Sequence, residues 1–254
     1  MKILISIIFL ILINIVNSNP NISFEAVQVE NNGYDGISMG IEIKVMEQGQ
    51  GDYLYSLGNH FIGDVKSLIY IGISTKDNGT AVFSTMDKES ITNSPNCIKT
   101  LSDGTMCTKK FNFQYELTNN MTIERVGHDD SQQFYQGYVS FKNKESVIEK
   151  VVVGEFSVPL KRKCLDSNSV FIDKYFSESE SHCKTYSKYF IDPPQYSFQG
   201  VWIPHQKVTS IDIRETNSKC RDKDQIYKPN SQVMKIEYNK EIFYLIENGM
   251  LSNK

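Results

Sequence analysis

The sequence lacks the short motifs of several common enzyme and metal-binding classes. It contains no Gly-x-Ser-x-Gly motif of the serine hydrolases and no glycine-rich phosphate loop. It has only 4 histidines, with no Cys-x-x-Cys pair and no closely spaced histidine pair, so we expect no zinc or other metal and no cofactor. A basic stripe is also missing, and the net charge is −3, which argues against nucleic acid or an anionic membrane surface as a partner.

Long apolar runs are confined to the N-terminus. The run from Ile3 to Val16 is about 14 residues long, which suits the core of a signal peptide, whereas a spanning helix needs about 20. We expect residues 1–18 to be a signal peptide cleaved after Ser18, with an uncleaved membrane anchor as the alternative. Residues 19–254 would then form one secreted, extracellular β-rich domain with no transmembrane segment and a soft boundary near residue 194.

Five cysteines in a secreted chain are candidates for disulfides. Cys97 and Cys107 flank a turn signal, and we expect them to be bonded. Cys164, Cys183 and Cys220 compete for a second bond, and the shorter loop favours Cys164–Cys183. The remaining thiol is either free or links two chains, so the oligomeric state stays open.

Three sequons mark a candidate glycoprotein. Asn21, Asn78 and Asn120 each begin an Asn-x-Ser/Thr triplet, which would lie at the surface if glycosylated. Asn78 also begins the Asn-Gly of a hairpin between strands at Ser67–Thr75 and Thr80–Thr85, because Asn-Gly suits a tight type I′ turn. A glycosylated hairpin tip is scaffold and not a reactive centre.

Alternation of apolar and polar residues predicts an all-β fold. Residues Ile37–Val45 alternate with period two, as in a strand that has one buried face and one wet face. Phe111–Leu117 alternates as well and predicts another strand, whereas Gln48–Gly63 and Tyr186–Pro194 are interpreted as loops. More than ten short strands at regular spacing predict a β-sandwich or jelly roll.

Four stretches resemble a known family. They are Tyr70–Ser74, Val82–Asp87, Gly137–Pro159 and Phe171–Phe176. Together they are similar to the strands of the domain-of-unknown-function family numbered 3472, over roughly residues 68–196, with Met86 and Tyr138 in place of two tryptophans of that pattern. The resemblance implies a secreted, β-rich, lectin-like architecture and supplies no catalytic residues.

Acidic residues provide weak candidates for catalysis or calcium binding. The triplet His128-Asp129-Asp130 and the acids near His60 (Glu47, Asp52 and Asp64) could bind calcium, although the EF-hand spacing is absent. Glu42, Glu124 and Glu155 are expected on or near strands, and a glycosidase would need two such carboxylates across a cleft. A lyase would need a set drawn from His60, Arg125 and His205, which are far apart in the sequence. Solvated surface residues are the competing interpretation for all of these, and we assign no catalytic residue.

Aromatic residues are the better candidates for ligand contacts. There are 14 Tyr, 14 Phe and a single Trp, and exposed aromatic faces stack on sugar rings. Because binding residues concentrate in loops, we predict ligand contacts from Tyr53, Tyr55, Tyr189 and Trp202. The alternative is that these side chains pack into the core.

Three functions remain open from the sequence. The first is a non-catalytic β-sandwich that binds a glycan or an extracellular protein. The second is a secreted carbohydrate-active hydrolase or lyase on the same scaffold. The third is a structural extracellular protein that uses the odd cysteine to join chains.

Overall fold

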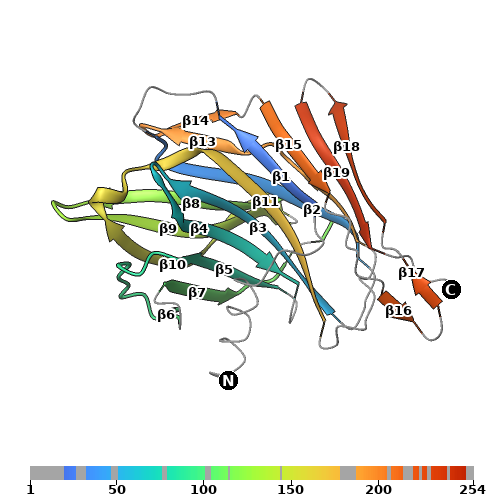
Figure 1. The fold of residues 1–254 in the computed structure, drawn as a ribbon, viewed down its shortest axis with the longest axis horizontal. Coiled ribbons are helices and arrows are strands. Elements are labelled where there is room, and N and C mark those ends of the chain that lie inside the picture. Colours follow the sequence, from blue (N-terminus) through green and yellow to red (C-terminus); the bar gives the residue numbers. More distant parts are fainter. Residues whose placement is uncertain are drawn as a thin grey trace.

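The computed structural model describes most of the chain after residue 19. The described residues are 20–26, 33–46, 51–75, 79–100, 104–113, 115–143, 145–177, 187–204, 207–213, 220–222, 225–227, 230–238 and 241–249. Two antiparallel sheets pack together, which confirms the predicted all-β sandwich (Figure 1). The predicted signal peptide at residues 1–18 lies outside the described residues. Among those residues no helix has the length and apolar character needed to cross a membrane.

The first sheet contains eight strands of the described chain. In spatial order they are β15 (Lys207–Ile213), β1 (Pro20–Glu25), β11 (Leu165–Ser177), β3 (Gly51–Phe61), β4 (Asp64–Ser74), β5 (Thr80–Thr85), β7 (Thr105–Lys110) and β6 (Cys97–Lys99). The predicted hairpin is confirmed as β4–β5, in which Ser74 pairs with Thr80. Asn78, at its tip, lies outside the described residues.

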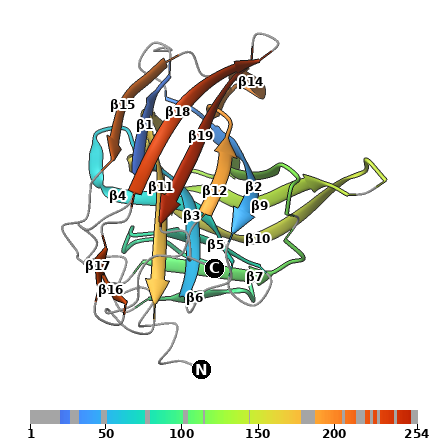
Figure 2. The same ribbon diagram turned by 90° about the vertical axis from the view of Figure 1, so that its right-hand side faces the viewer.

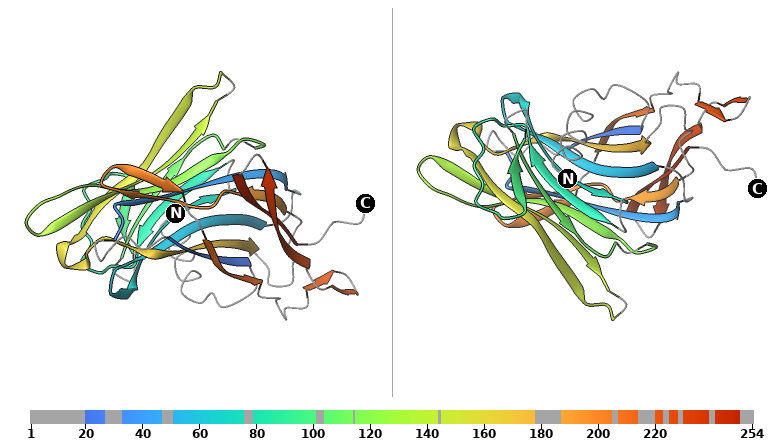
Figure 3. Two further views of the ribbon diagram at one scale, coloured as in Figure 1. Left: turned by 90° about the horizontal axis from the view of Figure 1, so that it is seen from above. Right: turned by 90° about the horizontal axis from the view of Figure 1, so that it is seen from below.

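The second sheet contains nine described strands. Its main path is β10 (Ile148–Pro159), β9 (Gln132–Lys142), β8 (Asn119–His128), β2 (Gly36–Met46), β12 (Ser187–Ile191), β19 (Glu241–Gly249) and β18 (Asn230–Tyr238). A branch adds β13 (Gln195–Phe198), which pairs with β2, and β14 (Val201–Pro204), which pairs with β13. The hairpin β9–β10 extends beyond the rest of the sandwich (Figures 2 and 3).

Two smaller elements complete the described chain. Strands β16 (Cys220–Asp222) and β17 (Gln225–Tyr227) form a separate two-stranded sheet. A short 3-10 turn, η2 (Leu160–Arg162), follows β10. Strands that follow residue 194 join both large sheets, since β13 pairs with β2 and β15 pairs with β1.

Alternating side chains explain why these segments fold as strands. On β2 the side chains of Ile37, Met39, Ile41 and Ile43 are buried in the core, while Glu42 is only half-buried. Burying one such side chain contributes about 1.5–3 kcal/mol, so the alternation fixes which face of the sheet points inward.

Two glycines of the second sheet let the first sheet approach closely. The ring of Phe83 on β5 occupies the space where a Cβ of Gly137 would lie. An added Cβ at Gly154 would lie 2.5 Å from the Cys107 sulfur and 2.6 Å from the Cys97 sulfur. The glycines are therefore required for packing between the sheets.

Three local predictions were wrong. Residues 111–113 and 115–117, predicted as a strand, form irregular chain and a turn, in which Glu116 has a positive φ of 61°. The predicted loop Gln48–Gly63 contains the 11-residue strand β3, and the predicted loop Tyr186–Pro194 contains β12. Both strands place alternate side chains in the core, so their aromatic content reflects burial and not exposure.

A bulge changes the side-chain alternation of β10. The pairing with β9 shifts register between Val152 and Gly154. Before the bulge Val152 pairs with Tyr138, and after it Glu155 pairs with Gln136. Because of the extra residue, Val152 and Glu155 both face outward although they are an odd number of positions apart.

Candidate functional site

A row of residues crosses the outer face of the second sheet in register. The cross-strand partners, in order from β10 to β14, are Glu155, Gln136, Glu124, Gly36, Ser197 and Trp202. A second row lies beside it and contains Tyr138, Thr122, Ser38 and Gln195. We call these two rows the polar face.

The orientation of the polar face follows from what lies on the inner side. Three fully buried core residues are direct sequence neighbours of residues of the polar face. They are Ile37, Ile123 and Tyr135. Successive side chains of a strand point to opposite sides, so the neighbours Gly36, Glu124 and Gln136 must point outward. Sequence reasoning had placed Glu124, Glu155 and Trp202 separately, and the register brings them onto one face.

The floor of the polar face is built around a glycine. An added Cβ at Gly36 would lie 3.2 Å from the Cη2 carbon of Trp202 and 2.9 Å from the carbonyl oxygen of Ile123. The indole therefore lies against the bare backbone of β2. Trp202 is half-buried, which leaves part of its surface open to solvent. The structure thus leaves Trp202 available for contact with a ligand.

Hydrogen bonds order the second row. The hydroxyl groups of Ser38 and Thr122 are 2.8 Å apart. The Tyr138 hydroxyl interacts with the side chains of Thr122 and Glu124, and burial followed by the charge of Glu124 raises the pKa of Tyr138 to about 12. Tyr138 therefore stays protonated at neutral pH and can donate to the carboxylate.

A lysine covers the ring of Tyr138. The Lys150 ammonium, on β10, lies 3.6 Å from the centre of the ring. Such a cation–π contact contributes about 0.5–1 kcal/mol at an exposed site. Lys150 itself is exposed.

The polar face combines an aromatic surface with hydrogen-bonding groups over a considerable length. Adjacent strands are about 4.8 Å apart, so the first row spans about 24 Å from Glu155 to Trp202. Along it lie the carboxylates of Glu155 and Glu124, the amide of Gln136 between them and the Trp202 indole at the far end, while the Ser197 hydroxyl is buried. Such an arrangement is suited to an extended ligand rich in hydroxyl groups.

Three of the four predicted ligand aromatics are in the interior, which corrects that prediction. Tyr53, Tyr55 and Tyr189 are at most 1% exposed, on β3 and β12. Tyr55 stacks on Tyr53 with ring centres 5.6 Å apart and meets Tyr189 edge-on at 4.8 Å. They pack in strands between the sheets because their rings supply core volume. The period-two pattern Tyr53, Tyr55, Leu57 was the signal that could have revealed this.

A buried carboxylate accompanies these tyrosines. The Tyr189 hydroxyl donates to Asp173 Oδ2 at 2.8 Å, and Asp173 is fully buried. Burial, followed by the charge of Asp173, raises the pKa of Tyr55 and of Tyr189 well above the usual tyrosine value. The hydrogen bond between Tyr189 and Asp173 thus links β11 of the first sheet to β12 of the second sheet inside the core.

The predicted acidic triplet is an ordinary hairpin turn. Asp129 Oδ1 accepts hydrogen bonds from the backbone amides of Ser131 and Gln132 at 2.7 Å, between β8 and β9. These bonds hold the pKa of the exposed Asp129 below its usual value. Within the described residues no group of three or more His, Cys, Asp or Glu is placed to hold a metal ion.

The acids of the predicted calcium loop are not brought together. Glu47 and the side chain of Asp52 lie outside the described part. Asp64 accepts from Ser67 at 2.8 Å and pairs with Arg162 at 2.6 Å. His60 is half-buried, which lowers its pKa.

Arg162 is the centre of an ion cluster that ties the two sheets together. Its Nε donates to Asp87 Oδ2 at 2.6 Å, where the Asp87 side chain is fully buried, and its Nη1 donates to Asp64. Glu89 lies at 3.4 Å and also pairs with Lys161. Every acid in this cluster is engaged by a cation, so the cluster is structural.

The remaining residues proposed for a lyase set are also accounted for. Arg125 pairs with Asp35 and donates to the Cys164 sulfur at 3.3 Å. His205 lies outside the described residues. Glu42, one of the glycosidase candidates, forms an ion pair with Lys44 at the surface.

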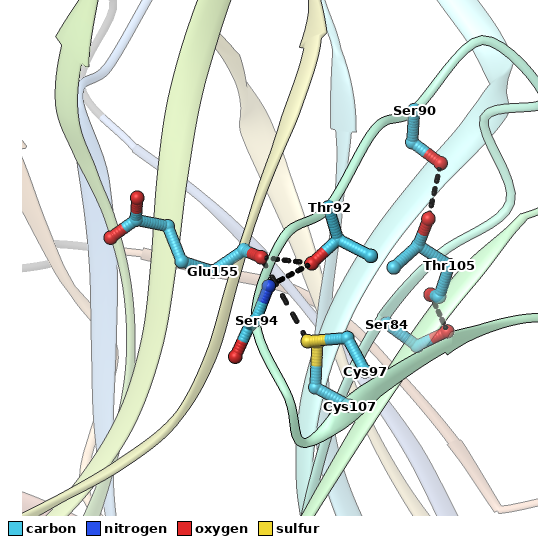
Figure 4. The surroundings of a disulfide bond; sticks show 8 residues. All are labelled: Ser84, Ser90, Thr92, Ser94, Cys97, Thr105, Cys107 and Glu155. Atoms are coloured by element: carbon cyan, nitrogen blue, oxygen red, sulfur yellow. Dashed lines mark hydrogen bonds between the residues drawn. A yellow bond between two sulfur atoms is a disulfide. The ribbon is translucent and has the colours of Figure 1, made fainter.

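One predicted disulfide is confirmed and the other is corrected. Cys97 and Cys107 are bonded and lie opposite each other on β6 and β7 (Figure 4). Cys164 carries a free thiol, so the Cys164–Cys183 pairing is not formed. The hydrogen bond from Arg125 engages the half-buried Cys164 sulfur, while Cys183 lies outside the described residues. In Figure 4 the Glu155 carboxylate points away from the disulfide.

The sequons fall in different surroundings. Asn120 is half-buried on β8, where it pairs with Gly40 and Ser140. Asn21 belongs to β1, although its side chain is outside the described part. Use of these sites for glycosylation stays a prediction.

Comparison with known proteins gives similar folds at very low identity. No family model and no curated protein matches the chain, so the resemblance to family 3472 stays a prediction. Scytalido-glutamic peptidase with a transition state analog inhibitor is 8% identical, with 91% of this chain and 98% of that chain covered and a TM-score of 0.47. SCP-B, of the eqolisin family of peptidases, is 9% identical over the same shares with a TM-score of 0.46. The PL-14 alginate lyase from Aplysia kurodai is 10% identical, over 63% of this chain and 82% of that chain, with a TM-score of 0.32. At these scores the similarities carry no assignment of function.

Proposed function

We propose that the protein binds an extended glycan along the polar face of its second sheet. The observation that carries this proposal is the register that aligns Glu155, Gln136, Glu124, Gly36, Ser197 and Trp202 across neighbouring strands. A secreted location, predicted from the N-terminal sequence, would expose this face to extracellular glycans.

The chemistry of the face suits sugars. The exposed part of the Trp202 indole can stack on the apolar face of a sugar ring, and the contact costs little conformational entropy because the ring already lies against Gly36. Gln136 offers both a donor and an acceptor, and Glu124 offers an acceptor, to ligand hydroxyl groups. The length of the row favours a glycan polymer over a single sugar.

The same row favours a second candidate, a glycan hydrolase. Glu124 and Glu155 lie two strands apart on one face, with Gln136 between them. Two strand spacings are about 9.6 Å, close to the upper end of the separation of about 6.5–9.5 Å between the two carboxyl groups of inverting glycosidases. Turnover would require one carboxyl group to protonate the leaving oxygen while the other activates water.

A glycan array with the purified chain, followed by fluorescence titration, tests the proposal. Trp202 is the only tryptophan, so its emission reports directly on the site. We expect a defined glycan class to bind and to shift this emission. By calorimetry Trp202→Ala should weaken binding about three- to tenfold, from the energy of an aromatic contact.

Val201→Ala is the matched control. Val201 is exposed on the same strand, and it points to the opposite side from Trp202. Its replacement should leave the affinity unchanged. A silent array, or equal losses in the two variants, would overturn the proposal. Shortening of a bound glycan on long incubation, abolished by Glu124→Gln, would establish the hydrolase instead.

A further inference from the structure

The charges on the polar face are not balanced. Neither Glu124 nor Glu155 forms an ion pair with any residue in the described part of the chain. They nevertheless lie on the same row, on either side of Gln136. A ligand that lies across this row therefore meets two carboxylates without a fixed counter-charge.

Within the described part of the chain, a cation contacts this face through a ring and not through an acid. The Lys150 ammonium lies 3.6 Å from the ring centre of Tyr138. The hydroxyl of that same ring interacts with Glu124. The ring thus already accepts an ammonium group, and the Glu124 carboxylate interacts with the hydroxyl of that same ring.

The features of Lys150 would allow a ligand to replace it at the ring. It is exposed, it has a flexible four-carbon stem, and it is located on the extended hairpin β9–β10 (Figure 2). A contact of about 0.5–1 kcal/mol is weak enough for a ligand to replace. By contrast, the Tyr138 ring is held in place by the strand and by its contacts with Thr122 and Glu124.

We propose that Tyr138 and Glu124 form a subsite for a cationic group of the ligand, which Lys150 fills in the free protein, so that the polar face selects amino sugars that carry a free ammonium. This inference rests on the proposed glycan-binding function and names the ligand class. A protonated amino sugar would place its ammonium over the Tyr138 ring and release Lys150 to solvent. An N-acetylated sugar has no charge at that position.

Two oligosaccharides of equal length test the subsite. Binding of glucosamine oligomers and of N-acetylglucosamine oligomers is measured by calorimetry and by Trp202 emission. We expect the charged oligomer to bind more tightly, with an affinity that falls as salt is added. Glu124→Gln should remove up to about fivefold of that preference, the range of an exposed ion pair.

Lys150→Met distinguishes displacement from simple attraction. Removal of the internal ammonium should tighten binding of the charged oligomer about two- to fivefold, because the ligand no longer competes for the ring. Lys109→Met, which changes an exposed lysine of β7 on the other sheet, is the control and should have no comparable effect. Near-ultraviolet circular dichroism confirms that the variants keep the fold.

The possible failures are distinct. Equal affinity for the two oligomers, tighter binding of the acetylated one, or no gain from Lys150→Met would overturn the cationic subsite and leave glycan binding intact. Absence of binding by every glycan tested would overturn the proposed function and the subsite together.

Discussion

The indole of Trp202 lies over Gly36, where an added Cβ would come within 3.2 Å of the ring and within 2.9 Å of the Ile123 carbonyl oxygen. The aromatic part of the polar face, on the branch strand β14, therefore depends on a missing side chain in β2, on the main path of the same sheet. Position 36 controls the site although it offers no functional group to a ligand.

Gly36→Val should displace the indole and weaken glycan binding. The new side chain would press on both the Ile123 carbonyl oxygen and the indole, so the strand must adjust and Trp202 must shift, at a cost of about 1–3 kcal/mol of folding stability. The emission of the single tryptophan should move toward that of a solvated indole. Gly127→Ala, on β8, is the control because an added Cβ there would meet only Phe134 at 4.0 Å. Unchanged emission in Gly36→Val would contradict the packing described.

Arg162→Met should destabilise the protein strongly. It leaves the fully buried Asp87 carboxylate without the guanidinium, and loss of one partner of a buried pair costs about 3–5 kcal/mol. Lys161→Met breaks only an exposed pair with Glu89 and should cost less than about 1 kcal/mol. Urea unfolding of both variants measures the difference. Similar losses in the two would show that Asp87 does not depend on Arg162.

Asp64→Asn should reduce the acid sensitivity of the fold. Hydrogen bonds from Ser67 and the charge of Arg162 hold the pKa of Asp64 below its usual value. The ionised form is therefore favoured in the folded state, and its stabilisation is complete above the unfolded pKa of about 4 and is lost as the pH falls through the folded pKa. The stability difference between wild type and Asp64→Asn should shrink as the pH is lowered from 6 to 3. Ser67→Ala, which removes the largest cause, should weaken the same pH dependence; a difference that grows on acidification would refute the assignment.

The double variant Cys97→Ala/Cys107→Ala should lose about 3 kcal/mol of stability, as expected for a closed loop of about ten residues. Thermal unfolding measures the loss. Reduction of the wild type should give the same midpoint shift and provides the control. A midpoint that reductant leaves untouched would mean that the crosslink does not constrain the unfolded chain.

Local alternation made much of the fold predictable. The pattern of Ile37, Met39 and Ile41 identified β2, and the spacing of Cys97 and Cys107 around a turn identified their bond. Both signals depend on residues close in sequence. The sequence could not show that Glu124 would meet Gln136 on one side and Gly36 on the other, because strand order and register are set by long-range pairing.

Aromatic residues misled the prediction of the site for a physical reason. Tyrosine suits a wet loop and a buried strand equally well, since its hydroxyl needs only one partner. For Tyr189 that partner is Asp173, from a strand of the other sheet, and composition alone does not reveal it. Trp202 is half-buried and not in the core, so its predicted role in ligand contact stays a prediction, and its packing against Gly36 could not be derived from the sequence.

The bulge of β10 between Val152 and Gly154 changes which side chains of the strand face outward. Val152 before it and Glu155 after it are both exposed, while Val153, Gly154 and Phe156 are buried. One residue fewer at this point would carry Phe156 to the solvent and turn the charge of Glu155 toward the core. The length of this segment, and not only its residue types, thus decides whether the hairpin contributes a carboxylate to the surface, so insertions and deletions here should be far less tolerated than substitutions.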